Sequence, residues 1–141
     1  MGGGDLPTMW PAFLAALLLT IPQASAQSKR EYDAQGRFEG RVEDGRRYDS
    51  QGRFQGRSEM RGDSRRDYDS QGRFQGRTEF RGDSARAYDS QGRFQGRTEF
   101  RGDTSRTYDA QGRFTGRSEA SGNSVRHYDA QGRFIGRTER R

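Results

Sequence analysis

Arginine supplies most of the chemistry that this sequence offers. The chain has 26 Lys and Arg against 20 Asp and Glu, a formal net charge of +6, and Lys29 is its only lysine. A guanidinium group makes paired hydrogen bonds with phosphate, sulfate and carboxylate, and it stacks on aromatic rings. The surplus of arginine therefore predicts an anionic polymer as the partner. The candidate binding residues recur at fixed positions beside Tyr and Phe: Arg37, Arg41, Arg53, Arg57, Arg73, Arg77, Arg93, Arg97, Arg113, Arg117, Arg133 and Arg137.

The residues that enzymes use for catalysis are scarce. The chain has no Cys and one His, His127, at a position that other repeats fill with Asp67, Ala87 or Thr107. We predict that His127 is a surface residue of a strand. No Ser–His–acid set recurs that could form a catalytic relay. Aspartates recur, but without the spacing of an EF-hand or of a calcium-binding nonapeptide. We therefore expect no enzymatic activity, no metal, no cofactor and no small-molecule substrate.

Arg-Gly-Asp occurs three times, beginning at Arg61, Arg81 and Arg101. On an exported protein this tripeptide could engage a cell-surface receptor. Gly-Asp is also good turn chemistry, and the corresponding spacer at residues 121–123 has Ser-Gly-Asn, which keeps the turn and loses both charges. We interpret these segments as turns.

The arginines belong to a ten-residue unit, Tyr-Asp-x-Gln-Gly-Arg-Phe-x-Gly-Arg, which occurs six times. The first spacing between units is 16 residues and the others are 20. Asp at the first position of a turn and Gly at the fourth are typical of a type I turn closed by a bulge. A three-residue loop at residues 70–72 would place Tyr68 opposite Phe74. Each unit is therefore predicted to be a tight β-hairpin.

A second turn signal, such as Gly62-Asp63, lies between units, and the faces of the strands depend on both loops. If both loops have three residues, Tyr and Phe share a face with the Arg two residues before each Tyr. If both have two residues, Tyr and Phe lie on opposite faces, and Glu59–Arg66, Glu79–Arg86 and Glu99–Arg106 become cross-strand pairs. We prefer the first alternative, because it gives one aromatic and one charged face. The aromatic face would comprise Tyr32, Phe38, Tyr48, Phe54, Tyr68, Phe74, Tyr88, Phe94, Tyr108, Phe114, Tyr128 and Phe134.

The short first spacer lacks four residues, or two per strand. Because side chains alternate with period two, this loss keeps every remaining side chain on its face. With few aliphatic residues, a two-layer core is not expected. We predict an all-β fold of tandem antiparallel hairpins, six units of about 20 residues, arranged as a meander or hairpin solenoid in which each unit contacts its neighbours.

The motif Tyr-Asp-x-x-Gly-Arg-Phe resembles the YD repeat of Rhs-type bacterial proteins and teneurins. The resemblance covers most of residues 32–137 and extends into the spacer from Arg77 to Asp83, where that family has its second turn. It implies β-hairpins stacked into a long winding sheet that forms a shell. A weaker likeness is to choline- and glucan-binding cell-wall repeats, but the paired Trp residues that hold choline are missing.

Residues 1–26 differ from the rest of the chain. The apolar run from Trp10 to Ile21 is too short for a comfortable membrane span, and small residues follow it. We predict a helical signal peptide over 1–26, cleaved between Ala26 and Gln27, and a repeat array over 27–141. The protein would then be periplasmic or secreted, with no membrane span after signal removal.

Export would bring the arginines to anionic polymers of the cell envelope or the extracellular space, such as acidic polysaccharides. The predicted function is therefore a structural or adhesive role through binding of these polymers. One alternative is a module for protein–protein interaction or self-assembly that pairs through open edge strands. A second alternative is an Arg-rich disordered segment.

Overall fold

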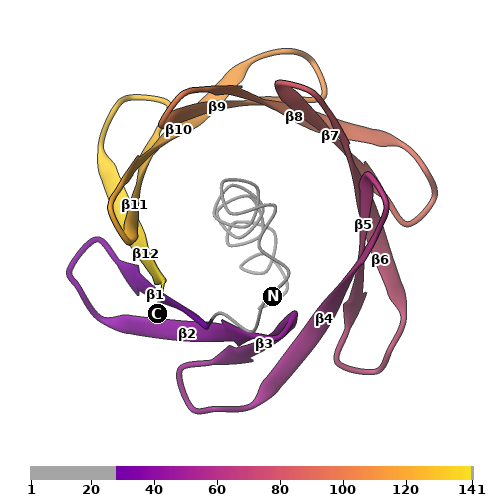
Figure 1. Ribbon diagram of the computed structural model, residues 1–141, viewed down its shortest axis with the longest axis horizontal. Coiled ribbons are helices and arrows are strands. Elements are labelled where there is room, and N and C mark those ends of the chain that lie inside the picture. The colour runs from indigo at the N-terminus through magenta and orange to yellow at the C-terminus, as the bar shows by residue number, and fades with distance from the viewer. Residues whose placement is uncertain (1–27, 141) are drawn as a thin grey trace, which may run out of the picture.

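The computed structural model describes residues 28–140, which form twelve antiparallel strands and no helix (Figure 1). The strands are β1 (Lys29–Asp33), β2 (Phe38–Glu43), β3 (Arg46–Asp49), β4 (Phe54–Arg61), β5 (Ser64–Asp69), β6 (Phe74–Arg81), β7 (Ser84–Asp89), β8 (Phe94–Arg101), β9 (Thr104–Asp109), β10 (Phe114–Ser121), β11 (Ser124–Asp129) and β12 (Phe134–Arg140). The all-β class and the hairpin meander are thus confirmed. Within residues 28–140 there is no helix long and apolar enough to cross a membrane. The predicted signal peptide and its cleavage site lie outside the described residues.

The meander closes on itself as a twelve-stranded barrel, because β1 pairs with β12 (Figure 1). The prediction of an open solenoid is wrong. At the seam Tyr32 lies opposite Arg137, in the same register as Tyr128 opposite Arg117 inside the array. Each hairpin therefore meets the next in the same way, and the accumulated turn brings the last strand to the first. Closure pairs the backbone groups that open edges would have exposed.

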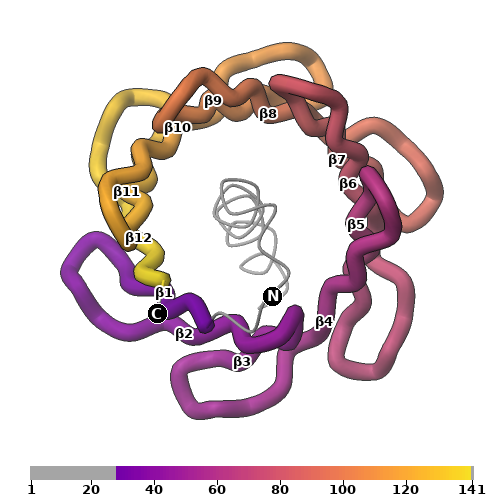
Figure 2. The backbone as a smooth tube through the Cα atoms, in the orientation of Figure 1, coloured from indigo at the N-terminus to yellow at the C-terminus, as the bar shows by residue number. Residues whose placement is uncertain are grey.

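The turn within each ten-residue unit, here called the first turn, is the predicted three-residue loop closed by glycine. In the third unit the Gly72 amide donates to the Asp69 carbonyl at 3.0 Å, and Gly72 has a φ of +83°. Asp69 Oδ1 accepts hydrogen bonds from the amides of Gln71 and Arg73, each at 2.9 Å. Tyr68 lies opposite Phe74, as predicted. The loops with this turn flare away from the ring (Figure 2).

The second turn has two residues, so the assumption that both loops have the same length is wrong. Arg61 pairs with Ser64 across Gly62 and Asp63, and the φ of +58° at Gly62 is typical of a type II′ turn. In the short spacer both Asp44 and Gly45 have positive φ, which indicates a type I′ turn. Across these loops the strand register places three glutamates directly opposite arginines, without an ion pair between them: Glu59–Arg66, Glu79–Arg86 and Glu99–Arg106.

A β-bulge in each hairpin restores the side-chain alternation that loops of unequal length would otherwise shift. Tyr68 lies opposite Phe74 while its neighbour Asp67 lies opposite Gly76, so Gln75 is the extra residue. As a result Tyr, Phe and the Arg two residues before Tyr share one face, as predicted for equal loops. A Cβ on Gly76 would lie 2.4 Å from the Tyr88 carbonyl oxygen, so only glycine fits there.

The short first spacer shortens both strands by an even number, as predicted. β2 and β3 have six and four residues, whereas β4 and β5 have eight and six. The faces of β2 and β3 therefore match those of the longer hairpins.

The two faces of the barrel wall differ in composition, although not as predicted. The outer face carries the Tyr and Phe rings together with Arg and Glu, so aromatic and charged residues are not separated. The inner face is buried and carries mainly small residues, which include Val42, Thr78, Ala85, Thr98, Ser105, Ser118, Val125 and Thr138.

Candidate functional site

A belt of stacked arginine and aromatic side chains encircles the outer face. In each hairpin the Tyr and Phe rings contact edge to face, with centroids 5.9 Å apart in the Tyr68–Phe74 pair. The arginine after the second glycine of each unit lies over the Tyr of the next hairpin, and the Arg77 guanidinium carbon is 4.4 Å from the Tyr88 ring centroid. Antiparallel pairing aligns the two residues, since Arg77 is directly opposite Tyr88. The belt comprises Arg41–Tyr48, Arg57–Tyr68, Arg77–Tyr88, Arg97–Tyr108, Arg117–Tyr128 and Arg137–Tyr32.

The belt arginines also bind carboxylates. Arg77 Nε donates to Glu79 Oε2 at 3.2 Å, and about a third of each of these side chains is exposed. An Arg–x–Glu spacing on one strand places both side chains on the same face. Half of the predicted anion-binding arginines are therefore occupied by an aromatic ring on one side and an acid on the other.

The other six predicted arginines bind the turn aspartates. Arg73 Nε lies 2.8 Å from Asp69 Oδ2, and its Nη2 donates to Gln71 Oε1 at 3.2 Å. Hydrogen bonds from the Arg73 backbone amide and side chain, and from the Gln71 amide, lower the pKa of Asp69, although desolvation opposes them. The Arg73 side chain is 75% exposed, so it reaches solvent, but its charge is compensated by the turn that it stabilises.

A third set of arginines, which the sequence did not lead us to choose, has no such acid. These residues lie two positions before each Tyr from Tyr48 to Tyr128. They are exposed on the outer face and make no hydrogen bond or ion pair with the described residues: Arg46, Arg66, Arg86, Arg106 and Arg126. Arg66 lies opposite Glu59 on one side and Arg77 on the other. Glu59 is already bound by Arg57 at 3.3 Å. The signal was present in the sequence. Each of the twelve chosen arginines has an acid at a spacing that suits contact, either Asp-x-x-x-Arg across the tight turn or Arg-x-Glu on one strand. The arginines of the third set have an Asp three residues later, an odd spacing that places the two side chains on opposite faces of a strand.

One hollow on the outer face brings two exposed arginines together. It has a volume of about 110 Å³ and is lined by Glu99, Arg101, Thr104, Arg106 and Tyr108. Arg101 ends β8, next to the type II′ turn, and Arg106 lies on β9 beside Tyr108. An oxyanion at this hollow would meet two guanidinium groups, one aromatic ring and the Glu99 carboxylate, whose charge is compensated by Arg97 at 3.2 Å.

His127 lies on the buried inner face, so its predicted surface location is wrong. It is 6% exposed; Nδ1 hydrogen bonds with Ser118 Oγ at 2.8 Å and Nε2 with Thr138 Oγ1 at 3.0 Å. Burial lowers the pKa of His127 to about 4. Both ring nitrogens bind hydroxyl groups, so no carboxylate orients the imidazole as a relay requires.

The buried Arg47, Arg65 and Asp67 lie on β3 and β5, and Glu31 lies on the nearby β1. Arg65 Nε lies 3.1 Å from Asp67 Oδ1, which also accepts a hydrogen bond from Ser58 Oγ at 2.6 Å. Burial raises the pKa of Glu31 to about 8, although the charge of Arg47 opposes the rise.

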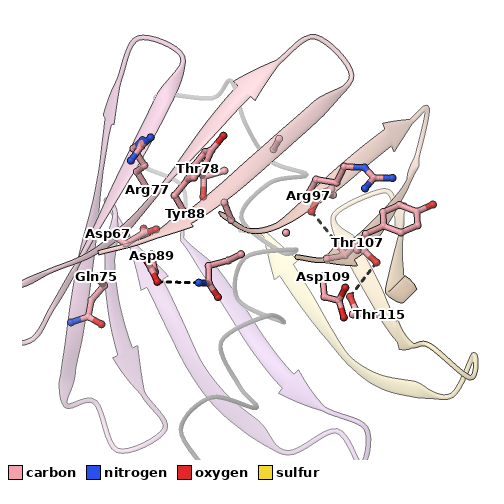
Figure 3. A pocket seen from close by; sticks show the side chains of 17 residues that line it. Asp67, Gln75, Arg77, Thr78, Tyr88, Asp89, Arg97, Thr107, Asp109 and Thr115 are labelled. Atoms are coloured by element: carbon pink, nitrogen blue, oxygen red, sulfur yellow. Dashed lines mark hydrogen bonds between the residues drawn. The ribbon is translucent and has the colours of Figure 1, made fainter. Parts of the chain in front are cut away.

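The inner wall between β5 and β10 borders a cavity of about 230 Å³ (Figure 3). Thr78, Ala87 and Thr107 line it, with Asp89 and Asp109 at positions nearer the flared end. Asp89 Oδ2 accepts a hydrogen bond from Gln95 at 3.1 Å, and Thr115 Oγ1 donates to the Thr107 carbonyl. Residues 28–140 contain no group of three or more His, Cys, Asp or Glu side chains placed to hold a metal ion.

No protein-family model matches this chain, and a search of curated proteins found no match either. The YD-repeat and cell-wall-repeat resemblances therefore remain predictions.

Proposed function

We propose that this protein has a structural or adhesive role and binds an anionic polymer of the cell envelope or extracellular space on its outer face. The observation that supports the proposal is the repeated exposed arginine without an acidic partner in the described chain, one in each hairpin from the second to the sixth. The paired arginines of the belt hold the local surface in place. The exposed set would make the ionic contacts, which revises the residues predicted from sequence.

Two features favour a sulfated, phosphorylated or carboxylated polysaccharide. Guanidinium groups bind these anions in paired geometry. The Phe rings that flank the arginines stay 36–39% exposed, and they offer apolar faces beside the charges: Phe38, Phe54, Phe74, Phe94, Phe114 and Phe134. A ligand with anionic groups on apolar-faced rings would use both.

Because each hairpin carries the same residues, a long polymer can bind several hairpins at once, which strengthens its overall binding. After one hairpin engages a polymer, the next presents the same residues at a fixed position on the same wall, so the second contact is intramolecular and benefits from a high effective concentration. A long polyanion is therefore expected to bind far more tightly than a single sugar phosphate. The predicted export of the chain would bring it to such polymers.

Closure of the barrel argues against the alternative in which the chain pairs, with itself or with another protein, through open sheet edges. The strands that would have been open, β1 and β12, pair with each other. The second alternative, a disordered Arg-rich segment, predicts a far-ultraviolet circular dichroism spectrum without β structure, whereas the barrel predicts a β spectrum.

Salt elution from a heparin column tests the proposed function. The variant R66Q/R86Q/R106Q removes three exposed charges, and R73Q/R93Q/R113Q removes three charges that are bound to turn aspartates. Because net charge changes equally, site binding predicts that the first variant elutes at markedly lower salt than the second. Flow-through of the unmodified protein at physiological salt, or an equal shift in both variants, would contradict the proposal.

A further inference from the structure

Three consecutive hairpins carry a second exposed arginine, at the end of the strand that precedes the second turn: Arg61, Arg81 and Arg101. The side chains of these residues form no hydrogen bond or ion pair with the described residues. The corresponding residue of β10 is Ser121, and the short hairpin of β2 and β3 has no counterpart. Among residues 28–140 the second arginine is therefore confined to one arc of the wall, from β4 to β9 (Figure 1).

In each of these hairpins the second arginine lies close to the exposed arginine that precedes Tyr by two residues. Arg101 is directly opposite Thr104, and Glu99 is directly opposite Arg106, so the two arginines are diagonal neighbours on the outer face. Diagonal neighbours across a strand pair lie about 7–8 Å apart, which is within reach of long side chains. The same register holds in the two preceding hairpins, for Arg61 with Arg66 and for Arg81 with Arg86.

The outer hollow of about 110 Å³ is lined by both arginines of one such pair, Arg101 and Arg106. The Glu99 carboxylate, which also lines it, is bound by Arg97 at 3.2 Å. The Thr104 hydroxyl donates to the Arg101 carbonyl oxygen at 3.0 Å, so it is not a donor for a ligand. The side-chain donors that the hollow offers to a ligand are therefore its two guanidinium groups, each of which carries five N–H groups.

Charge and donor geometry at this hollow favour a tetrahedral oxyanion ester. Asp103 of the adjoining turn forms no ion pair with Arg101 or Arg106, and two guanidinium groups against this one carboxylate leave a positive surplus. One guanidinium group satisfies a planar carboxylate, because both carboxylate oxygens accept from the same fork. A sulfate or phosphate ester has three terminal oxygens and so accepts from two forks at once. A water molecule occupies about 30 Å³ in the liquid, so the hollow has room for such a group.

We propose that the arc from β4 to β9 binds sulfate or phosphate esters of a polymer, with one ester between the two exposed arginines of each hairpin. The three sites are Arg61 with Arg66, Arg81 with Arg86, and Arg101 with Arg106. They lie in neighbouring hairpins of identical register, so one polymer can occupy all of them. These sites rest on the proposed function, since they specify its anion and the part of the outer face that holds it.

Three dextrans of equal chain length and equal degree of substitution test the choice of anion: dextran sulfate, dextran phosphate and carboxymethyl dextran. A sulfate ester and a carboxylate carry the same charge at pH 7, so their comparison separates geometry from charge. In calorimetric titrations dextran sulfate should bind about tenfold more tightly than carboxymethyl dextran, because a second charged donor takes part. The more tightly bound of the sulfate and phosphate polymers identifies the ester that the sites prefer.

The same titrations separate this proposal from the proposed function. If all three dextrans bind but neither ester binds more tightly than carboxymethyl dextran, the ester sites are refuted and the proposed function stands. If none of the three binds at physiological salt, both are refuted.

The variant R61Q/R81Q/R101Q tests the second arginine. It leaves one guanidinium group in each site, which suits a carboxylate as well as an ester. Binding of the preferred ester should therefore weaken about tenfold, and the preference over carboxymethyl dextran should disappear. The control R73Q/R93Q/R113Q removes three charges that are bound to turn aspartates and should keep the preference. A first variant that is folded by circular dichroism and keeps the preference would overturn the proposal.

The variant Ser121→Arg tests the sites by a gain of binding. It gives the end of β10 the arginine of the preceding hairpins, diagonally opposite Arg126, and so builds one more site. The control Ala130→Arg adds the same charge at an exposed position of a first turn. Ser121→Arg should tighten binding of the preferred ester about threefold more than Ala130→Arg does. Equal effects of the two variants would show that net charge alone matters and would refute the assignment.

Discussion

The Arg137 guanidinium carbon lies 4.3 Å from the centroid of the Tyr32 ring, although the two residues belong to opposite ends of the repeat array. The same contact joins neighbouring hairpins elsewhere, for example Arg97 over Tyr108 at 4.4 Å. Arg137 also donates to Glu139 at 2.9 Å, which matches the belt pattern. The seam of the barrel is therefore chemically equivalent to its internal interfaces.

This equivalence predicts equal effects of equivalent mutations. Arg137→Ala and Arg97→Ala each remove a cation–π contact and an ion pair, and each should lower the free energy of unfolding by about 1–2 kcal/mol. Urea denaturation measures both values. In an open array Tyr32 would not lie under Arg137, so a much smaller effect of Arg137→Ala than of Arg97→Ala would refute closure.

The two glycine types of the unit should differ in their tolerance of alanine. Gly76→Ala forces a Cβ against the Tyr88 carbonyl oxygen and should destabilise the protein by about 3 kcal/mol or more, because backbone atoms must move. Gly72→Ala meets nothing within 4 Å and is opposed only by its positive φ, so about 1–2 kcal/mol is expected. Thermal unfolding of the two variants compares them. Similar losses would mean that the strands are not as close at Gly76 as the structure shows.

His127 should make stability fall in mild acid. Burial lowers its pKa in the folded protein to about 4, below the value of 6.5 for an exposed His. The unfolded chain therefore binds a proton first, and stability should be lost as the pH falls from about 6.5 to 4, by about 3 kcal/mol in total. His127→Thr, which copies Thr107 of the preceding unit, should remove this slope. Because the chain has one His, its NMR titration reports the pKa directly, and a value near 6.5 would contradict the burial.

Glu31 should make stability fall as the pH rises, the opposite of the effect of His127. Burial raises its pKa in the folded protein to about 8, so folding favours the protonated form. Its contribution to stability is present below about pH 4.5 and is lost as the pH rises to about 8, with a total of a few kcal/mol. Glu31→Gln should flatten this part of the stability curve. Unfolding free energies between pH 5 and 8, measured in the His127→Thr background, isolate the effect, and an unchanged slope would contradict it.

Local chemistry predicted the hairpin well and the global shape poorly. Asp69 and Gly72 specify the first turn through short-range hydrogen bonds and a positive φ, so the Tyr68–Phe74 pair followed from the sequence. The bulge at Gln75 depends on how two strands twist together, which no single residue predicts. Closure depends on the sum of many small rotations between strands, so the sequence pattern could not predict it.

The difference between local spacing and overall geometry also explains which site residues could be predicted from the sequence. Composition indicated arginine as the binding residue, and spacing alone would have shown that Asp69–Arg73 and Arg77–Glu79 are internal pairs. The burial of His127 required knowledge of the face on which the pre-tyrosine position lies. That face was fixed by the two loop lengths together with the bulge.

Because the register is uniform around the ring, the order in which the strands are connected can be changed without changing their pairing. Lys29 and Arg140 pair directly across the seam, so the first and last strands lie side by side. In a shortened chain of residues 29–140, a short linker between these two residues and new termini in any of the second turns would give a circularly permuted protein with every strand pair intact. Such permutants should fold to the same shape, because no position around the circumference is privileged as a starting point.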